Sequence, residues 1–232
     1  MGVTQAYLKF IGIDFDIVAS NNHASPTGAL PFLIPAFPVG SQIPIPSSKL
    51  QKWAIEEAHC EEEQQLNTRF EAYASLLDNR IRSAWVCLPD VSGFRLTRQL
   101  YTLYLDTDNF SAVARRLYVN PATTNCIVRT ALAIQLQQAA RDELQKSSQY
   151  IDASNLIADA GDAFEALATL LGEDQYFYGR PKPGLFDASM FAYTHLILDE
   201  GMGWKHDALG RLLRKHENLV QHRNRLLGLF NR

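Results

Sequence analysis

The sequence predicts an α+β N-terminal part followed by an all-helical part. Residues 17–48 contain no Asp, Glu, Lys or Arg and hold six of the ten prolines of the chain. Because proline cannot donate to a β-ladder and is costly inside a helix, this stretch favours short strands and loops. From about residue 65 onward, apolar residues recur at helical spacing with few prolines. The 232 residues suffice for two domains, which we place at residues 1–60 and 61–232.

The N-terminal part is expected to combine helices with short strands. The predicted elements are a helix over residues 3–10, strands over residues 13–17, 29–36 and 41–45, and a helix from Lys49. Gly12 is suited to end the first helix, and residues 13–17 alternate apolar and acidic side chains as a half-exposed strand does. Residues 21–28 favour a loop because they are rich in turn-forming residues. Ser47 or Ser48 can cap the helix that follows.

Pro31 is the most informative residue of this part. It lies between apolar, strand-prone residues in the segment Gly-Ala-Leu-Pro-Phe-Leu at residues 28–33. A proline at such a position implies a special backbone geometry, so we predict a cis peptide bond at the start of a strand.

The C-terminal part is predicted to be helical throughout. Three-and-four apolar spacing predicts helices around residues 66–77, from near Pro121 to residue 139, and over residues 162–171, 187–198 and 207–230. Pro121 is acceptable in a first helical turn, and Gly172 is placed to end a helix. The helix over residues 187–198 is strongly apolar and is expected at the centre of the bundle. The Gly-Met-Gly segment at residues 201–203 lacks a dinucleotide fingerprint and predicts a turn between helices.

Composition and charge exclude several classes of protein. The net charge of −3 provides no basic field of the kind that nucleic-acid binding requires. Cys60, Cys87 and Cys126 are odd in number and widely spaced, which argues against a disulfide scaffold and a zinc site and favours reduced thiols. No secretory signal pattern is visible at the start of the sequence, and prolines interrupt the long uncharged stretch, so we predict no membrane-spanning helix.

The order of strand, loop, Leu-Pro, capped helix and helical domain resembles the glutathione-transferase fold over nearly the whole chain. The resemblance implies a thioredoxin-like N-terminal domain, truncated and lacking a first strand, followed by an all-α domain like the C-terminal domain of glutathione transferases. In transferases a hydroxyl or cysteine near the end of the first strand stabilises the glutathione thiolate. That position is missing from this sequence, so we expect no catalytic residue and no cofactor.

Three segments are similar to metaxins, which are accessory subunits of the sorting and assembly machinery in the mitochondrial outer membrane. Residues 20–32 carry Asn-Asn before Ser-Pro-x-Gly-x-Leu-Pro, residues 176–188 carry Tyr-Phe-Tyr-Gly-Arg-Pro and then Leu-Phe-Asp-Ala, and residues 216–220 are His-Glu-Asn-Leu-Val. The first segment is the most specific. The chain resembles the fungal-type subunit that caps the barrel and receives the client signal more than its larger sister.

The metaxin resemblance implies a non-catalytic protein that lies peripherally on the cytosolic face of the mitochondrial outer membrane. Its expected partners are the membrane-embedded Omp85-type β-barrel subunit, a second metaxin-like subunit, and β-barrel precursor proteins. The chain would help to recognise the β-signal of these precursors and assist their insertion; the contacting residues are not predicted. The alternatives are a glutathione-dependent transferase, the sister metaxin-type subunit of the same complex, and a scaffold in an unrelated cytosolic complex.

Two features that a transferase uses to bind glutathione or to fold have simpler explanations here. Ser47 and Ser48 can bind a ligand carboxylate at a helix N-terminus, although a helix cap is favoured by about four to one. Asp187 can bind the start of its own helix. Gly184, however, replaces the Ser or Thr that completes the capping box in transferases.

The histidines do not form a recognisable catalytic or metal site. His23 with Cys60, and His195 with Asp187 or Asp199, have no supporting spacing. The remaining histidines lack the four-residue interval of a zinc-binding helix and are expected to be exposed or locally paired: His206, His216 and His222. We predict no metal site.

Charge is unevenly distributed along the chain. Residues 205–232 hold seven Lys or Arg against Asp207 and Glu217, a local net charge of +5. A solvated helix face is the favoured explanation, and contact with anionic lipid headgroups or an acidic partner is the alternative. Glutamates at positions 56, 57 and 61–63 form an acidic patch that is expected to be solvated.

Overall fold

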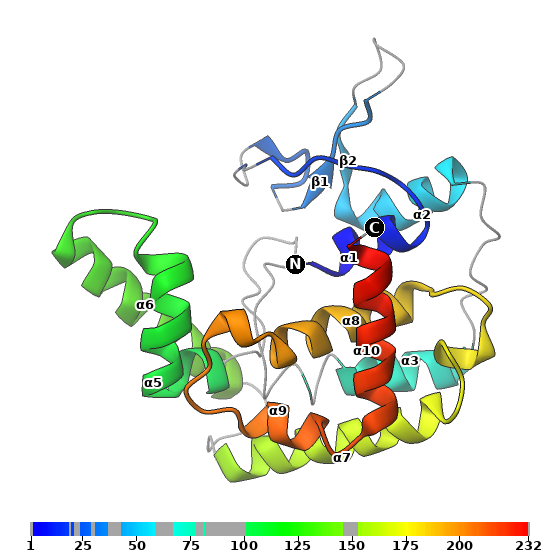
Figure 1. Ribbon diagram of the computed structural model, residues 1–232. Helices are drawn as coiled ribbons and strands as arrows, with labels where there is room; N and C mark the ends of the chain where they lie inside the picture. Colours follow the sequence, from blue (N-terminus) through cyan, green and yellow to red (C-terminus); the bar gives the residue numbers. More distant parts are fainter. Residues whose placement is uncertain are drawn as a thin grey trace.

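The computed structural model describes residues 2–18, 20, 24–28, 31–36, 43–58, 67–77, 81, 101–145 and 153–231. Its elements, in order, are α1 (Val3–Phe10), β1 (Phe32–Leu33), β2 (Ile45–Pro46), α2 (Ser47–Glu57), α3 (Asn67–Leu76), η3 (Tyr101–Leu105), α5 (Thr107–Asn109), η4 (Phe110–Val119), α6 (Cys126–Gln145), α7 (Ala153–Leu171), η5 (Phe177–Gly179), α8 (Leu185–Leu198), η6 (Glu200–Met202), α9 (Ala208–Leu213) and α10 (Glu217–Phe230). The predicted order of an α+β part and a helical part is confirmed (Figure 1).

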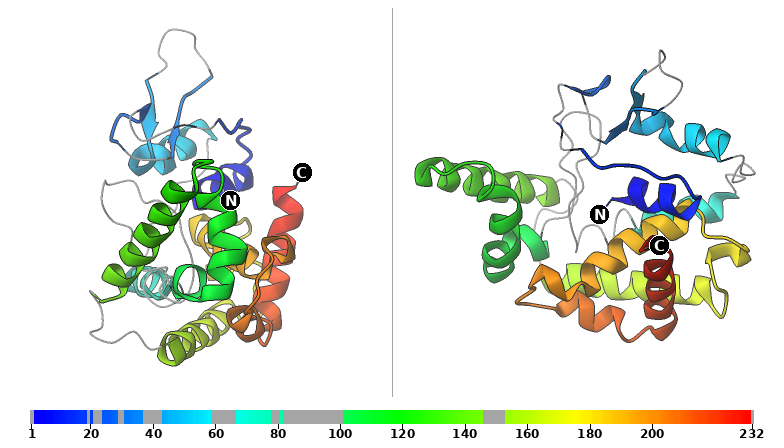
Figure 2. Two further views of the ribbon diagram at one scale, coloured as in Figure 1. Left: turned by 90° about the vertical axis from the view of Figure 1, so that its left-hand side faces the viewer. Right: turned by 45° about the horizontal axis from the view of Figure 1, so that its top comes forward.

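The first helix forms where the sequence predicts it. α1 buries Ala6, Tyr7 and Leu8, and its chain then reverses at Gly12, which has φ +82°. A side chain is strained at such a φ, which explains glycine there. α1 packs against α8 and α10, so the N-terminal segment is fixed on the helical part (Figure 2).

The predicted strand over residues 13–17 is wrong. Ile13 and Phe15 pack against the N-terminal core, and Asp14 and Asp16 are exposed, yet the described residues 13–18 form no strand. Alternation reports which side chains face the core, whereas a strand also requires a hydrogen-bonded neighbour. The sequence pattern therefore predicted the exposure of residues 13–16 correctly, but it was wrong about the exposure of Ile17, which is 71% exposed, and about the pairing.

The two later strands are present but short. β1 and β2 pair antiparallel, with Phe32 opposite Pro46 and Leu33 opposite Ile45. Pro31 precedes β1 directly, as predicted; its cis peptide bond stays a prediction.

The expected serine cap of α2 is wrong. Pro46 is both the end of β2 and the N-cap residue of α2, and no side-chain cap bond forms. Because pairing with β1 holds Pro46 extended, the helix begins at Ser47 itself, and both serines lie inside its first turn.

Pro121 does not start a helix, which corrects a second predicted boundary. It lies in the turn after η4, and α6 begins at Cys126. Asn125 supplies the cap, since its Oδ1 accepts hydrogen bonds from the backbone N–H of Ile127 at 2.9 Å and of Val128 at 3.4 Å. Asparagine is among the strongest N-cap residues, and it outweighs the tolerance of a first turn for proline.

The single helix predicted over residues 207–230 is two helices. The chain turns between α9 and α10, and the backbone carbonyl of His216 accepts from Leu219 and Val220 at the start of α10. Both halves keep the apolar spacing, so the pattern alone did not reveal the break. The predicted helix ending at Gly172 is confirmed as α7, with φ +56° at Gly172.

α8 is the central helix, as its composition predicts. Phe186, Met190 and Ile197 belong to the larger core among the helices, whereas Ala188 and Phe191 belong to the core shared with α1 and α2. One apolar helix therefore joins the N-terminal and C-terminal parts. Among the described residues, no helix is both long and apolar enough to cross a bilayer.

Candidate functional site

A buried carboxylate lies at the start of α8. Asp187 is 1% exposed, and its Oδ2 accepts from the backbone N–H of Gly184 at 2.9 Å. Its Oδ1 accepts from the backbone N–H of Phe177 at 3.0 Å and from Nε2 of His222 at 2.7 Å. The predicted interaction of Asp187 with its helix start is confirmed. Glycine has no side chain, so only the aspartate half of the capping box exists.

The partner of Asp187 is His222, which lies in α10 and is fully buried. The expectation that His222 is exposed or locally paired is therefore wrong, because its partner lies 35 residues away in the sequence. The His222 ring stands edge-on to Phe177, with the ring centroids 5.1 Å apart, and its Nδ1 has no hydrogen-bond partner among the described residues. A buried charge is tolerated only where it is paired, and here one carboxylate fastens η5, α8 and α10 together. We call Asp187, His222, Phe177 and Gly184 the aspartate knot.

His195 has a different environment. It stacks on Phe191 with the ring centroids 5.3 Å apart, and its Nδ1 lies 3.1 Å from a guanidinium nitrogen of Arg223. Burial and the Arg223 charge lower the pKa of His195, and the charge of Asp199 opposes them. Because a guanidinium can only donate, Nδ1 of His195 accepts this hydrogen bond from Arg223.

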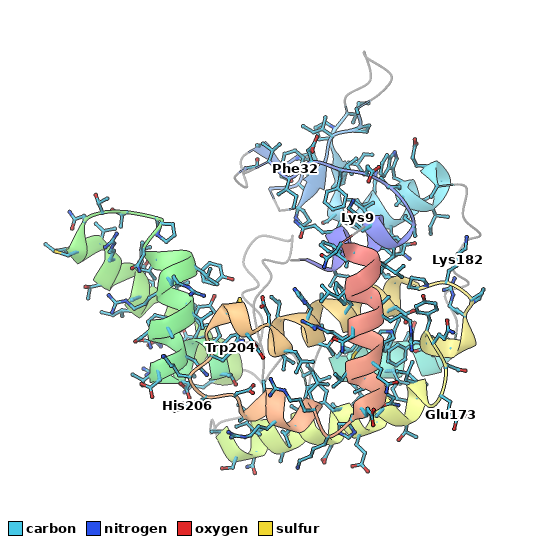
Figure 3. All side chains as sticks on the ribbon, viewed as in Figure 1. Lys9, Phe32, Glu173, Lys182, Trp204 and His206 are labelled. Atoms are coloured by element: carbon cyan, nitrogen blue, oxygen red, sulfur yellow. The ribbon has the colours of Figure 1, made fainter. Side chains whose placement is uncertain are left out.

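Polar contacts fasten the segment from η3 to α6, which we call the arm, to the chain between α8 and α9. Asn109 is fully buried and makes three hydrogen bonds to this chain. Its Oδ1 accepts from the backbone N–H of Lys205 at 2.8 Å and of His206 at 3.0 Å, and its Nδ2 donates to the backbone carbonyl of His206. Arg116 donates to the carbonyls of Gly201 and Met202. Figure 3 shows Trp204 and His206 on this chain, beside the arm.

His206 adds an ionic contact to this junction. Its Nδ1 lies 2.6 Å from Asp106 Oδ2, and its Nε2 lies 3.4 Å from Asp108 Oδ2. The hydrogen bond and charge of Asp106 raise the pKa of His206, with Asp108 adding to them and Arg211 opposing them. A shallow hollow nearby is lined by Asp108, Ser111, Ala112 and Lys205. Among the described residues, no group of His, Cys, Asp and Glu is arranged to hold a metal ion.

Several other predicted candidates are placed separately or not described. Cys126 is exposed at the start of α6, and His216 is half-buried at the start of α10. The predicted turn at residues 201–203 is confirmed as the end of η6, with φ +74° at Gly203. The remaining candidates lie outside the described residues: Asn21, Asn22, His23, Cys60, Cys87 and the glutamates at 61–63.

Pro31 and Ser47 border the last residue pair of the sheet. Phe32 pairs with Pro46, so Pro31 directly precedes this pair in the chain, and Ser47, at the start of α2, directly follows it. Ser47 is half-buried, and Ser48 and Pro31 are exposed. The turn before this site is held by Ser25, whose carbonyl accepts from Gly28 N–H at 3.2 Å.

Two family models match the two parts of the chain. The glutathione S-transferase N-terminal domain model matches residues 3–88, and the glutathione S-transferase C-terminal domain model matches residues 160–226. The chain is a glutathione S-transferase-like protein. No curated protein matches it.

This glutathione S-transferase-like chain has two of its three metaxin-like segments at the aspartate knot. Residues 176–188 contain Phe177, Gly184 and Asp187, and α10 supplies His222 just after residues 216–220. Within the last segment, Asn218 Nδ2 donates to the carbonyls of Ala168 and Gly172 at the end of α7. These contacts hold η5, α7, α8 and α10 together.

The surface around that sheet is strongly apolar. Four large aliphatic side chains are more than half exposed there: Ile17 (71%), Val18 (81%), Ile34 (54%) and Ile43 (75%). Ile34 and Ile43 flank β1 and β2 in sequence. Ile17 and Val18 follow Ile13 and Phe15, which pack with Leu33 and Ile45 against one core. Sequence reasoning missed this set, although the uncharged stretch over residues 17–48 was its signal.

Proposed function

We propose that the chain is a non-catalytic subunit of the sorting and assembly machinery that binds the β-signal of β-barrel precursors. It would assist their insertion into the mitochondrial outer membrane, lying peripherally on the cytosolic face. The glutathione S-transferase-like fold supports the proposal, since metaxins share that fold, and so do the three metaxin-like segments. Its partners would be the Omp85-type barrel subunit and a second metaxin-like subunit.

The observation that carries the proposal is the exposed apolar surface beside a minimal sheet. Within the described residues the sheet has two strands, so each of them has one edge that no described strand pairs. Exposed Ile34 follows β1, and exposed Ile43 precedes β2. Contiguous exposed apolar side chains on a folded protein mark an interaction surface.

An extended client segment suits such a surface. A peptide that adds to a sheet edge gains backbone hydrogen bonds, and its alternate side chains face the same side. The apolar set of a barrel strand would therefore meet the exposed isoleucines, while its polar set would face solvent. Binding and release of this kind require no nucleophile and no general base.

A peptide-binding measurement tests the client role. A labelled peptide with the sequence of the last strand of a β-barrel precursor should bind the purified chain. The double substitution Ile34→Asp and Ile43→Asp should weaken binding about tenfold or more, because the apolar contact area is lost. Ile127→Asp, a matched change on an isoleucine that is 76% exposed far from the sheet, should leave it unchanged. Equal affinity of all three proteins would contradict the client role.

Affinity purification tests the assignment to the complex. The tagged chain, recovered from mitochondria solubilised in mild detergent, should bring down an Omp85-type barrel protein and a second metaxin-like subunit. Recovery only from the soluble cytosol would favour an unrelated scaffold. Co-purification with a closely similar metaxin in the client-receiving position would favour the sister-subunit role.

A glutathione-dependent transferase is the second candidate, and one observation favours it. Pro31 and Ser47 border the Phe32–Pro46 pair in the chain, and Ser47 lies at the start of α2, where helical N–H groups favour an anion. Retention on immobilised glutathione that is lost with Ser47→Ala and Ser48→Ala, together with thiol conjugation, would establish the enzyme. Ser111→Ala, on η4, is the control for the two substitutions.

A further inference from the structure

Polar contacts hold the arm on one short piece of chain. Residues 199–207 connect α8 to α9, and we call them the strap. Asn109 and Arg116 of the arm both form hydrogen bonds to backbone groups of the strap. The strap is tied to α8 by Trp204, whose Nε1 donates to the backbone carbonyl of Leu196 at 3.2 Å. A change in the strap therefore alters how firmly the arm is held.

One contact between the arm and the strap depends on a titrating group. The His206 ring lies between two carboxylates of the arm, with its Nδ1 2.6 Å from Asp106 Oδ2 and its Nε2 3.4 Å from Asp108 Oδ2. A protonated imidazole carries a proton on both nitrogens, whereas a neutral one has a lone pair on one of them. The neutral ring therefore turns a lone pair toward one carboxylate, and only the protonated ring favours both contacts.

The environment of Asp106 makes this charge important. Its side chain is only 17% exposed. Its Oδ1 accepts from the backbone N–H of Asn109 at 2.9 Å and caps α5, while its Oδ2 faces His206. A carboxylate that is largely removed from water is stable as an anion only when it is paired. Among the described residues, His206 is the one cationic side chain within ion-pair distance of Asp106.

Other charges near the His206 ring do not cancel this effect. The remaining charged residues around the ring come from the strap and α9: Lys205, Arg211, and Asp207 in its ion pair with Arg214. Arg211 opposes protonation of the ring. The hydrogen bond and charge of Asp106 outweigh Arg211 and raise the pKa of His206.

We infer that His206 is a proton-operated clasp: its protonated ring bridges the two carboxylates and tightens the arm on the strap, and loss of the proton loosens this junction. Because the pKa of His206 is raised above 6.5, the clasp is closed below pH 6.5 and opens as the pH rises through the raised pKa. The hydrogen bonds of Asn109 and Arg116 involve no group that titrates in this range, so the arm stays attached and the loosening is local.

NMR-detected hydrogen exchange of the full chain tests the inference. Each measured rate is divided by the intrinsic rate at the same pH, so the resulting protection factors report the junction alone. At Lys205 and His206, whose amides bind Asn109, protection should fall about threefold between about pH 5.5 and about pH 8. Amides in the middle of α8 should keep their protection. A parallel fall there would overturn the inference, because the change would then be global.

Substitutions that fix the charge at position 206 sharpen the test. His206→Gln removes the charge and should give low protection at every pH. His206→Arg keeps a charge, so its protection should not depend on pH and should exceed that of the glutamine variant at about pH 8. Asp108→Asn removes one of the two carboxylates and should move the midpoint of the pH transition downward. A histidine with only a packing role would show no such shift.

Controls separate the clasp from other histidines and from the client role. His216→Gln, at a half-buried histidine just before α10, should keep the wild-type pH profile. Ile34→Asp with Ile43→Asp should also keep it, because those side chains flank the sheet and the clasp needs no β-signal. A wild-type profile that does not depend on pH, or a pH dependence that His206→Gln retains, would overturn the inference.

Discussion

The aspartate knot and the β1–β2 sheet differ in how many of their hydrogen-bonding groups are paired within the described structure. Both carboxylate oxygens of Asp187 accept hydrogen bonds, from donors in η5, at the start of α8 and in α10, and the side chain is buried. The short sheet keeps an edge on each strand that no described strand pairs, and it is flanked by exposed isoleucines. Residues whose interactions are satisfied internally stabilise the fold, whereas unsatisfied surface is available to a partner. Mutations in the aspartate knot should therefore lower stability, whereas mutations around the sheet should weaken binding of a partner.

Removing the knot carboxylate should have the largest effect on stability. Asp187→Ala leaves two buried N–H groups and His222 without their acceptor, so we expect a loss of about 3–5 kcal/mol in the free energy of unfolding. Urea denaturation measures it. Asp14→Ala, at a carboxylate whose side chain is 97% exposed, should leave the unfolding midpoint unchanged. Equal midpoints for the two variants would show that the knot is not structural.

The histidine of the knot should matter less than the aspartate. His222→Ala removes one hydrogen bond and the ring packed on Phe177, but Asp187 keeps its two backbone donors. We expect a loss of about 2–4 kcal/mol by urea denaturation. His216→Ala, at a half-buried histidine just before α10, is the control. A loss larger than that of Asp187→Ala would make the histidine, and not the aspartate, the main stabilising residue of the knot.

Breaking the attachment of the arm should cost less stability than either substitution in the aspartate knot. Asn109→Ala deletes a buried side chain that makes three hydrogen bonds to residues 205–206, so we expect a loss of about 1–3 kcal/mol. Hydrogen exchange should increase at Lys205 and His206 more than at the α8 amides. Asn224→Ala, at an exposed asparagine of α10, should change neither region.

The ionic contact at the same junction should depend on pH. The pKa of His206 is raised above 6.5, because the folded protein favours the protonated ring beside Asp106. Its stabilisation is therefore fully present below pH 6.5 and is lost as the pH rises through the raised pKa. NMR titration should place the pKa of His206 above 6.5 and that of His195 below 6.5. The reverse order would contradict both environments.

Substitutions on the sheet surface should have the smallest effect on stability. Ile17→Asp changes a side chain that is 71% exposed, so the unfolding midpoint should move little while client-peptide affinity falls. Differential scanning calorimetry measures the unfolding midpoint, and the peptide-binding assay measures the affinity for the client peptide. A fall in stability without a fall in affinity would assign Ile17 to the fold instead.

The sequence predicted the fold well because apolar periodicity and helix-ending glycines are local signals. Gly12 and Gly172 were correctly predicted to end α1 and α7, and the apolar stretch from Asp187 to Leu198 identified the central helix. The errors came from interactions between distant residues. The strand over residues 13–17 lacked a described neighbour, and β pairing set the start of α2 at Ser47.

The candidate sites were less predictable for the same reason. Asp187 was recognised through its helix, but its partner lies 35 residues away, and nothing in the local sequence around His222 indicates a buried hydrogen bond to a carboxylate. The exposed isoleucines carry no required chemistry, so only the structure separates them from core residues with the same side chain.

Pro46 has a mechanical consequence. It ends β2 and caps α2, so no loop separates the strand from the helix. A displacement of the strand is passed directly into the helix, since a stiff junction cannot absorb it as a flexible loop would. Trp53 lies in α2 with its indole partly buried against the N-terminal core. The intrinsic fluorescence of Trp53 should therefore change when the sheet moves.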